Sequence, residues 1–129
     1  MDPRQPSGKH VLIVEDEDTT RDMLAMLLQA EGYSVAGAGN GEEALAYLRN
    51  RRVPNLILLD LMMPIMDGWK FRRIQRKDPL LAEIPVVVVS AAGDVGQTAV
   101  ALSAAGFLDK PVEPTHLLAT IRRLCEAPA

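Results

Sequence analysis

The sequence has few of the features that mark exported or membrane proteins. Its one cysteine, Cys125, cannot form an internal disulfide, so a reducing compartment is the simpler expectation. No apolar run approaches the roughly 20 residues that span a bilayer, and the first residues lack the apolar core of a signal peptide. We therefore predict a cytoplasmic protein with no membrane partner.

Basic and aromatic side chains are also too few for a typical nucleic-acid-binding protein. The formal net charge is −3, whereas such proteins usually present a basic surface. There are one tryptophan, two tyrosines and two phenylalanines, so few rings are available for base stacking. One segment is basic, but we interpret it as a solvated helix face; it contains Lys70, Arg72, Arg73, Arg76 and Lys77. We predict no direct contact with nucleic acid.

What is present is an apolar-rich chain of 129 residues, of which 48% are hydrophobic, enough for one continuous core. Residues 1–8 are rich in proline and polar side chains and are expected to form a flexible lead-in. Residues 9–127 are expected to form one domain. The sequence has no internal repeat and no linker between domains.

Short apolar runs alternate with amphipathic segments along this domain. The runs are typical of buried strands, and they cover 11–14, 33–38, 56–60, 86–90 and 107–108. Between them, apolar residues recur at helical spacing, and candidate cap residues stand at helix starts: Asp18, Asn40 with Glu43, Asp94 with Gln97, and Pro114 in a first turn. This alternation predicts a parallel sheet with helices on both faces, a doubly wound α/β fold.

Polar residues stand where the predicted strands end. Glu15 and Asp16 follow the first strand, Asp60 ends the third, Ser90 ends the fourth, and Lys110 follows the fifth. Because parallel strands end at one edge of the sheet, these side chains should share one shallow pocket. Carboxylates about 4 Å apart repel by roughly 4 kcal/mol at an effective dielectric near 20. Lys110 offsets part of this repulsion, and an oxygen-only site suits Mg²⁺.

Each of these residues alone has a plainer interpretation. An acidic residue at a strand end is most often solvated or caps a helix, and a lone serine or lysine is most often a turn or surface residue. The joint arrangement at one edge, in the right strands, favours a functional pocket.

The chain resembles the receiver domains of bacterial two-component response regulators. The resemblance runs from Lys9 to about Glu126 and rests on four segments in order: 11–17 (VLIVEDE), 58–68 (LLDLMMPIMDG), 85–92 (PVVVVSAA) and 106–111 (GFLDKP). It implies a flavodoxin-like, three-layer fold of five strand–helix units, with strand order 2-1-3-4-5.

The resemblance also implies a role for each pocket residue. Asp60 would accept a phosphoryl group in a Mg²⁺-dependent reaction, with Mn²⁺ as a possible substitute. Asp16 and Asp60 would bind the metal through their side chains, Met62 through its backbone carbonyl, and Glu15 through a water. Lys110 and Ser90 would contact the phosphoryl oxygens. The Lys110–Pro111 bond would be cis in the family pattern, although most X-Pro bonds are trans.

A conformational switch is a further implication. Ser90 would move toward the phosphoryl group, and Phe107 would turn inward, at a position where many receivers have tyrosine. The alternative is that Phe107 is simply a core residue. We expect the glycine-containing segment 91–96 to be the most mobile ordered part of the protein and part of its output face. Since Met62 and Ala92 cannot hold an attacking water by a hydrogen bond, we hypothesise a long-lived acyl phosphate.

Three other functions are open to the sequence. An aspartate-based phosphatase usually needs a second acid two residues after its nucleophile, where this chain has Met62. A flavin or nucleotide module needs a phosphate-binding first loop, whereas this loop is acidic at residues 15–18. A degenerate receiver that signals by binding alone is disfavoured because no pocket residue is missing.

We therefore predict a regulatory phosphoacceptor rather than an enzyme, one that catalyses only its own phosphorylation and dephosphorylation. The expected partners are a sensor histidine kinase or a histidine phosphotransfer protein, and a downstream protein target or an output domain absent from this chain. The protein is expected to be a monomer or a phosphorylation-dependent dimer.

Overall fold

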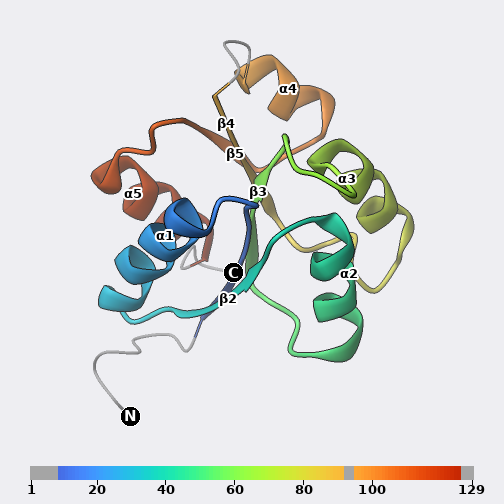
Figure 1. The fold of residues 1–129 in the computed structure, drawn as a ribbon, viewed down its shortest axis with the longest axis horizontal. Helices are drawn as coiled ribbons and strands as arrows, with labels where there is room; N and C mark the ends of the chain where they lie inside the picture. Colours follow the sequence, from blue (N-terminus) through green and yellow to red (C-terminus); the bar gives the residue numbers. More distant parts are fainter. Residues whose placement is uncertain (1–8, 92–94, 126–129) are drawn as a thin grey trace.

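The computed structural model describes residues 9–91 and 95–125, which form five strands and five helices in strict alternation (Figure 1). In chain order these are β1 (His10–Val14), α1 (Asp18–Ala30), β2 (Ser34–Ala38), α2 (Gly41–Asn50), β3 (Leu56–Asp60), α3 (Gly68–Lys77), β4 (Val86–Ser90), α4 (Val95–Ala101), β5 (Gly106–Asp109) and α5 (Pro114–Cys125). The predicted lead-in 1–8 and the predicted cap at Asp94 lie outside the described residues. No helix in the described part is long and apolar enough to cross a membrane.

The five strands form one parallel sheet in the order β2-β1-β3-β4-β5, which confirms the predicted strand order. Strand β2 pairs with one edge of β1, and the chain then crosses over β1 so that β3 pairs with its other edge. This reversal of direction lies between β1 and β3, which is where doubly wound sheets bind their ligands.

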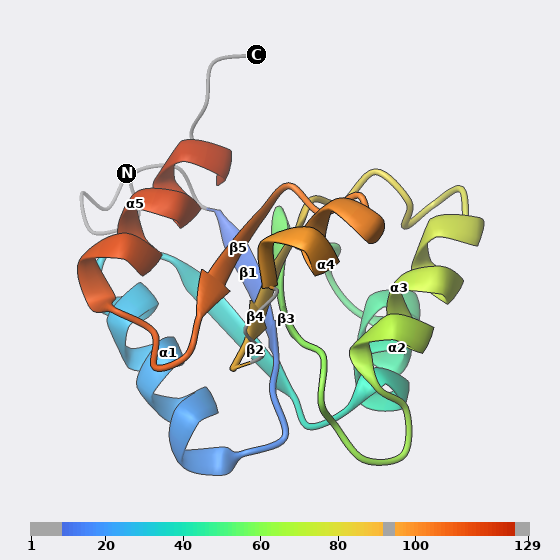
Figure 2. The same ribbon diagram turned by 90° about the horizontal axis from the view of Figure 1, so that it is seen from above.

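Helices cover both faces of the sheet, with α1 and α5 on one face and α2, α3 and α4 on the other (Figures 1 and 2). Alternate residues of each central strand point to opposite faces, so β1 contributes Leu12 and Val14 to one core and Val11 and Ile13 to the other. The strands β1, β3 and β4 are buried along their whole length. The continuous apolar runs of the sequence therefore reflect burial on both faces.

Most predicted helix starts agree with the structure. The Asn40 side chain accepts a hydrogen bond of 3.0 Å from the Glu43 backbone N–H, as the capping spacing predicted. Pro114 is the first residue of α5. The cap predicted at Asp18 is wrong: the N-cap of α1 is Glu17, and its side chain makes no capping bond to the backbone. Asp18 is instead the first helical residue, where it pairs with Arg21 at 2.5 Å and its charge favours the helix dipole.

Gly68 lets helix α3 begin directly against the end of β3. Its N–H donates to the Leu61 carbonyl at 3.1 Å, and a Cβ atom built on it would lie 2.5 Å from the Asp60 carbonyl oxygen and 2.8 Å from the Leu61 Cα. Both neighbours are backbone atoms, so neither can move aside cheaply. The close approach therefore requires glycine and fixes the backbone that carries Asp60.

We predict that Gly68→Ala lowers the free energy of unfolding by about 1–3 kcal/mol, because the added methyl group overpacks this contact. The matched control is Gly106→Ala, whose Cβ would meet only side-chain atoms at 3.6 Å or more. Urea denaturation of the two variants measures the difference. Equal stability of both variants would show that the contact at Gly68 is not restrictive.

Candidate functional site

The loops that follow the strands bring the predicted pocket residues to the carboxyl edge of the sheet. Glu15 and Asp16 come directly after β1, Asp60 and Ser90 are the last residues of β3 and β4, and Lys110 follows β5. The Glu15 backbone continues the sheet pairing, since its N–H donates to the Ala38 carbonyl at 2.9 Å.

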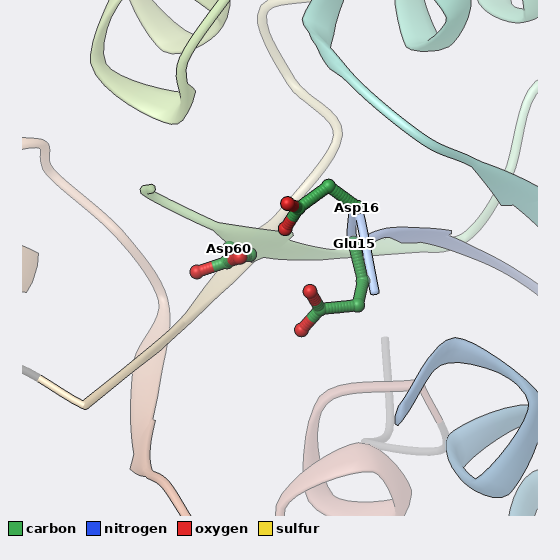
Figure 3. A group of neighbouring side chains, drawn as sticks. All are labelled: Glu15, Asp16 and Asp60. Atoms are coloured by element: carbon green, nitrogen blue, oxygen red, sulfur yellow. The ribbon is translucent and has the colours of Figure 1, made fainter. Parts of the chain in front are cut away.

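Three carboxylates converge in this pocket. Each of Glu15, Asp16 and Asp60 offers an oxygen within 4.8 Å of those of the other two. Figure 3 shows the three side chains close together where β1 and β3 end. Glu15 and Asp60 are only 2% and 4% exposed, whereas Asp16 is exposed to solvent. The cluster is therefore buried on one side and open to solvent on the other.

Lys110 provides the positive charge that faces the two buried carboxylates. Its Nζ lies 2.6 Å from Glu15 Oε1 and 3.6 Å from Asp60 Oδ2. The Lys110 backbone N–H donates to the Ser90 carbonyl at 3.1 Å, and the Lys110–Pro111 peptide bond is cis. The lysine thus pairs more closely with Glu15 than with Asp60, a preference that the sequence did not indicate.

The two buried carboxylates have opposite pKa shifts. Burial and the nearby charge of Glu15 raise the pKa of Asp60 to about 6, despite the attraction of Lys110. Burial also acts to raise the pKa of Glu15, but hydrogen bonds from Lys110 and from the Glu17 backbone N–H outweigh it and lower the pKa overall. The pKa of Lys110 is raised: burial opposes its charge, but Glu15 and Asp60 favour it more strongly. Of these two carboxylates, Asp60 is therefore the one whose charge is less compensated.

The chemistry of this pocket fits a hard divalent cation. All three side chains offer carboxylate oxygens, the ligand type that Mg²⁺ prefers, and the open side leaves room for the waters that Mg²⁺ keeps. The absence of sulfur and imidazole groups among the three disfavours zinc as the intended ion. An added cation would also reduce the repulsion that raises the pKa of Asp60.

The remaining predicted residues differ in burial and in their relation to the cluster. Ser90 is buried beside it at the end of β4. The Met62 side chain is 75% exposed, while its backbone N–H donates to Asp60 Oδ1 at 3.3 Å. Phe107 is 44% exposed on β5, so the interpretation of this ring as a simple core residue is wrong. Part of the segment predicted to be mobile, 91–96, and with it Ala92, lies outside the described residues.

The sequence interpretation missed two residues that support the pocket. Arg21 on α1 donates from Nη1 to the Glu15 carbonyl at 2.7 Å, which ties the first helix to the acidic loop. Glu113 accepts hydrogen bonds from the backbone N–H groups of Thr115 and His116 and so caps α5 just after the Lys110 loop. Glu113 directly before Pro114 is a signal that could have indicated this cap. No sequence signal pointed to the Arg21 contact.

The fold and the site together define a doubly wound α/β domain with an acidic pocket at its switch point, where three carboxylates are close enough to share a metal ion. Residues 11–122 match the family model described as the response regulator receiver domain. The chain is 39% identical over 118 residues to a probable transcriptional regulator, ycf27, of Cyanophora paradoxa, a match that covers 90% of this chain and 48% of the relative.

Solved structures agree with this match. A putative response regulator from Chloroflexus aurantiacus superposes with a TM-score of 0.86 at 30% identity, covering 93% of this chain and 99% of the other. The chemotaxis response regulator CheY4 of Vibrio cholerae gives a TM-score of 0.83 at 32% identity, covering 92% and 99%. The chain belongs to the response regulator receiver domain family of two-component systems. It spans about half the length of the curated relatives it matches.

The pKa of Asp60 leads to a prediction about the protein without metal. Because the folded state raises this pKa above the usual value near 4, ionisation of Asp60 destabilises the fold, and the cost is fully present above about pH 6. In the presence of a chelator at pH 7.5, Asp60→Asn should therefore be more stable than the wild type by about 1–3 kcal/mol. The gain should shrink as the pH falls through 6 and vanish near pH 4.

Denaturant unfolding of both proteins across this pH range measures the effect. A wild type that is more stable than Asp60→Asn at pH 7.5 without metal would contradict it, as would a difference that does not change with pH.

Proposed function

We propose that Asp60 accepts a phosphoryl group from a histidine kinase or a histidine phosphotransfer protein, and that this modification switches the domain's interaction with its output target. The observation that carries the proposal is the position of the Asp60 carboxylate at the end of β3. It is buried in a pocket that opens to solvent, it faces Glu15 and Asp16, and it lies 3.6 Å from the Lys110 ammonium.

In the proposed reaction, an Asp60 carboxylate oxygen attacks the phosphorus atom of the donor. A bond from this oxygen to phosphorus forms as the bond from phosphorus to the donor's histidine nitrogen breaks. The bonding electron pair stays on that nitrogen, and because the other ring nitrogen carries a proton, a neutral imidazole leaves. Lys110, whose Nζ lies 3.6 Å from Asp60 Oδ2, is close enough to form an ion pair with a phosphoryl oxygen once the group is transferred. The Ser90 hydroxyl is expected to donate a hydrogen bond to a second phosphoryl oxygen. A pKa of about 6 leaves Asp60 largely ionised at neutral pH, which a nucleophile requires.

The residues that would hold the metal are Asp16 and Asp60 through their carboxylates, Met62 through its carbonyl and Glu15 through a water. Mg²⁺, or Mn²⁺ in its place, would supply positive charge to the oxygens of the group being transferred. Attack by water on the acyl phosphate would then restore the Asp60 carboxylate and release inorganic phosphate, so the domain's own chemistry would consist of its phosphorylation and dephosphorylation. We accordingly propose a regulatory role rather than turnover of a substrate.

The switch is proposed to run from Ser90 to Phe107. Ser90 and Asp109 are paired in register on β4 and β5, so a shift of Ser90 toward a phosphoryl group acts on the strand that carries Phe107. The ring is 44% exposed, and turning inward would bury more of its apolar surface. The face formed by α4 and β5 would then change shape. It would act on a separate target or an output domain, as a monomer or a phosphorylation-dependent dimer.

The first test is to incubate the protein with Mg²⁺ and acetyl phosphate and to record its intact mass. We predict that the wild type gains one phosphoryl group when Mg²⁺ is present and gains none when the metal is chelated. Asp60→Asn should gain none in either case. Gain of the same mass by Asp60→Asn would contradict the assignment of Asp60. If Mg²⁺ neither binds nor promotes any mass gain, a receiver that acts by binding alone replaces the proposal.

The exposed Met62 side chain leads to a prediction about the lifetime of the phosphorylated form. Since it is 75% exposed and only its backbone contacts Asp60, substitution there should leave the core intact. Met62→Asn should speed the loss of phosphate several-fold, because an amide can orient an attacking water and a thioether cannot. Met62→Leu is the apolar control, and release of inorganic phosphate from the purified phosphorylated protein is the measurement. Equal rates in all three proteins would count against the hypothesis.

A further inference from the structure

A second concave surface lies away from the acidic pocket, between α3 and α4. These two helices are neighbours on the same face of the sheet (Figures 1 and 2). The groove between them has a volume of about 480 Å³, within the range of ligand-binding clefts. Its lining is basic and apolar, without a single carboxylate: Trp69, Arg72, Arg73, Arg76, Lys77, Ala101 and Leu102.

Three cations of the groove are exposed and available to a partner. Arg76 and Lys77 follow Arg73 by three and four residues, so the three side chains project from one side of α3. Within residues 9–91 and 95–125, none of the three forms an ion pair with another side chain. Like charges on one helix face repel each other, so this arrangement costs stability unless a partner offsets it.

The fourth cation, Arg72, has a different role because its charge is used within the protein. It is only 6% exposed, and it donates from Nε to the Leu102 carbonyl at 3.0 Å and from Nη2 to the Ser103 carbonyl at 2.9 Å. Its Nη1 donates to Gln75, whose amide in turn donates to the Leu81 and Ile84 carbonyls. This network connects the turn after α4 to α3, so the floor of the groove is held in place before any ligand arrives.

The groove also has an apolar part. Trp69 is 38% exposed at the start of α3, four residues before Arg73. The opposite wall is formed by Ala101, the last residue of α4, and by Leu102, which follows it. A ligand that fills the groove therefore meets an apolar surface beside a row of cations. An amphipathic acidic helix offers both features at matching spacing, because its carboxylates and apolar side chains also recur every three or four residues.

We propose that this groove is a docking surface for an acidic amphipathic segment of a partner protein, with its carboxylates on Arg73, Arg76 and Lys77 and an apolar side chain against Trp69. Charge complementarity identifies the occupant. A nucleic acid fits less well, since the chain as a whole carries a net charge of −3 and Trp69 is its only tryptophan. The docking involves neither Asp60 nor the metal pocket.

Because Trp69 is the only tryptophan, its fluorescence reports binding in the groove directly. The probe is a short helical peptide of glutamate, alanine and leucine, with glutamates on one side and leucines on the other. A peptide of the same pattern with glutamine in place of every glutamate tests the role of charge, and a single-stranded oligothymidylate of similar charge tests the nucleic-acid alternative.

The test variant is Arg73→Glu/Arg76→Glu. The matched control is Arg49→Glu/Arg51→Glu, which changes the net charge of the protein by the same amount but at the end of α2 and its C-cap, outside the groove. We expect the wild type and the control to bind the glutamate peptide with a change in Trp69 fluorescence, and the groove variant to bind at least tenfold more weakly. Circular dichroism verifies that both variants fold.

Any of the following results would overturn the proposal. The first is equal loss of binding in the groove variant and the control, which would show only an effect of net charge. The second is equal binding of the glutamine and glutamate peptides, or no binding of the glutamate peptide to the wild type. The third is tighter binding of the oligothymidylate with the same dependence on Arg73 and Arg76, which would make this a nucleic-acid groove.

Discussion

Repulsion among Glu15, Asp16 and Asp60 is the constraint on which the rest of this structure depends. Two unit charges about 4 Å apart cost roughly 4 kcal/mol at an effective dielectric near 20, a large share of the 5–15 kcal/mol by which a domain is stable. The fold keeps these carboxylates together because each one is attached to the end of a buried strand. Lys110 offsets part of the repulsion, and its closer contact with Glu15 leaves Asp60 the less compensated group.

The surrounding structure serves to hold this arrangement. Fully buried strands β1, β3 and β4 fix the backbone on which the charges stand, Gly68 allows α3 to begin against the Asp60 carbonyl, and Arg21 ties α1 to the Glu15 carbonyl. An uncompensated carboxylate at a solvent-open edge is suited to binding a cation and to attacking a phosphoryl group as a nucleophile. The same imbalance that weakens the metal-free fold would thus support the proposed phosphorylation.

The sequence predicted the fold and the membership of the pocket well, because both follow from strong local patterns. Uninterrupted apolar runs predict strands buried on both faces, and in a parallel sheet the residues after each run must meet at one edge. It failed where a contact depends on side-chain positions in three dimensions, as with the Arg21 contact, the preference of Lys110 for Glu15, and the cap wrongly assigned to Asp18. Ile65 was equally unforeseen: its φ of 68° is unusual for a β-branched residue and follows from the hydrogen bonds of its neighbours, Met66 N–H to Pro64 and Gly41 N–H to Met66.

The most direct test of this account is a calorimetric titration of Mg²⁺ into the wild type, Asp16→Asn and Asp60→Asn at pH 7.5. If the carboxylate cluster is a cation site maintained against its own repulsion, one Mg²⁺ should bind the wild type, and each substitution should weaken binding by tenfold or more. Equal affinity in all three proteins, or no binding by the wild type, would contradict the central claim that these charges are held together to bind a cation.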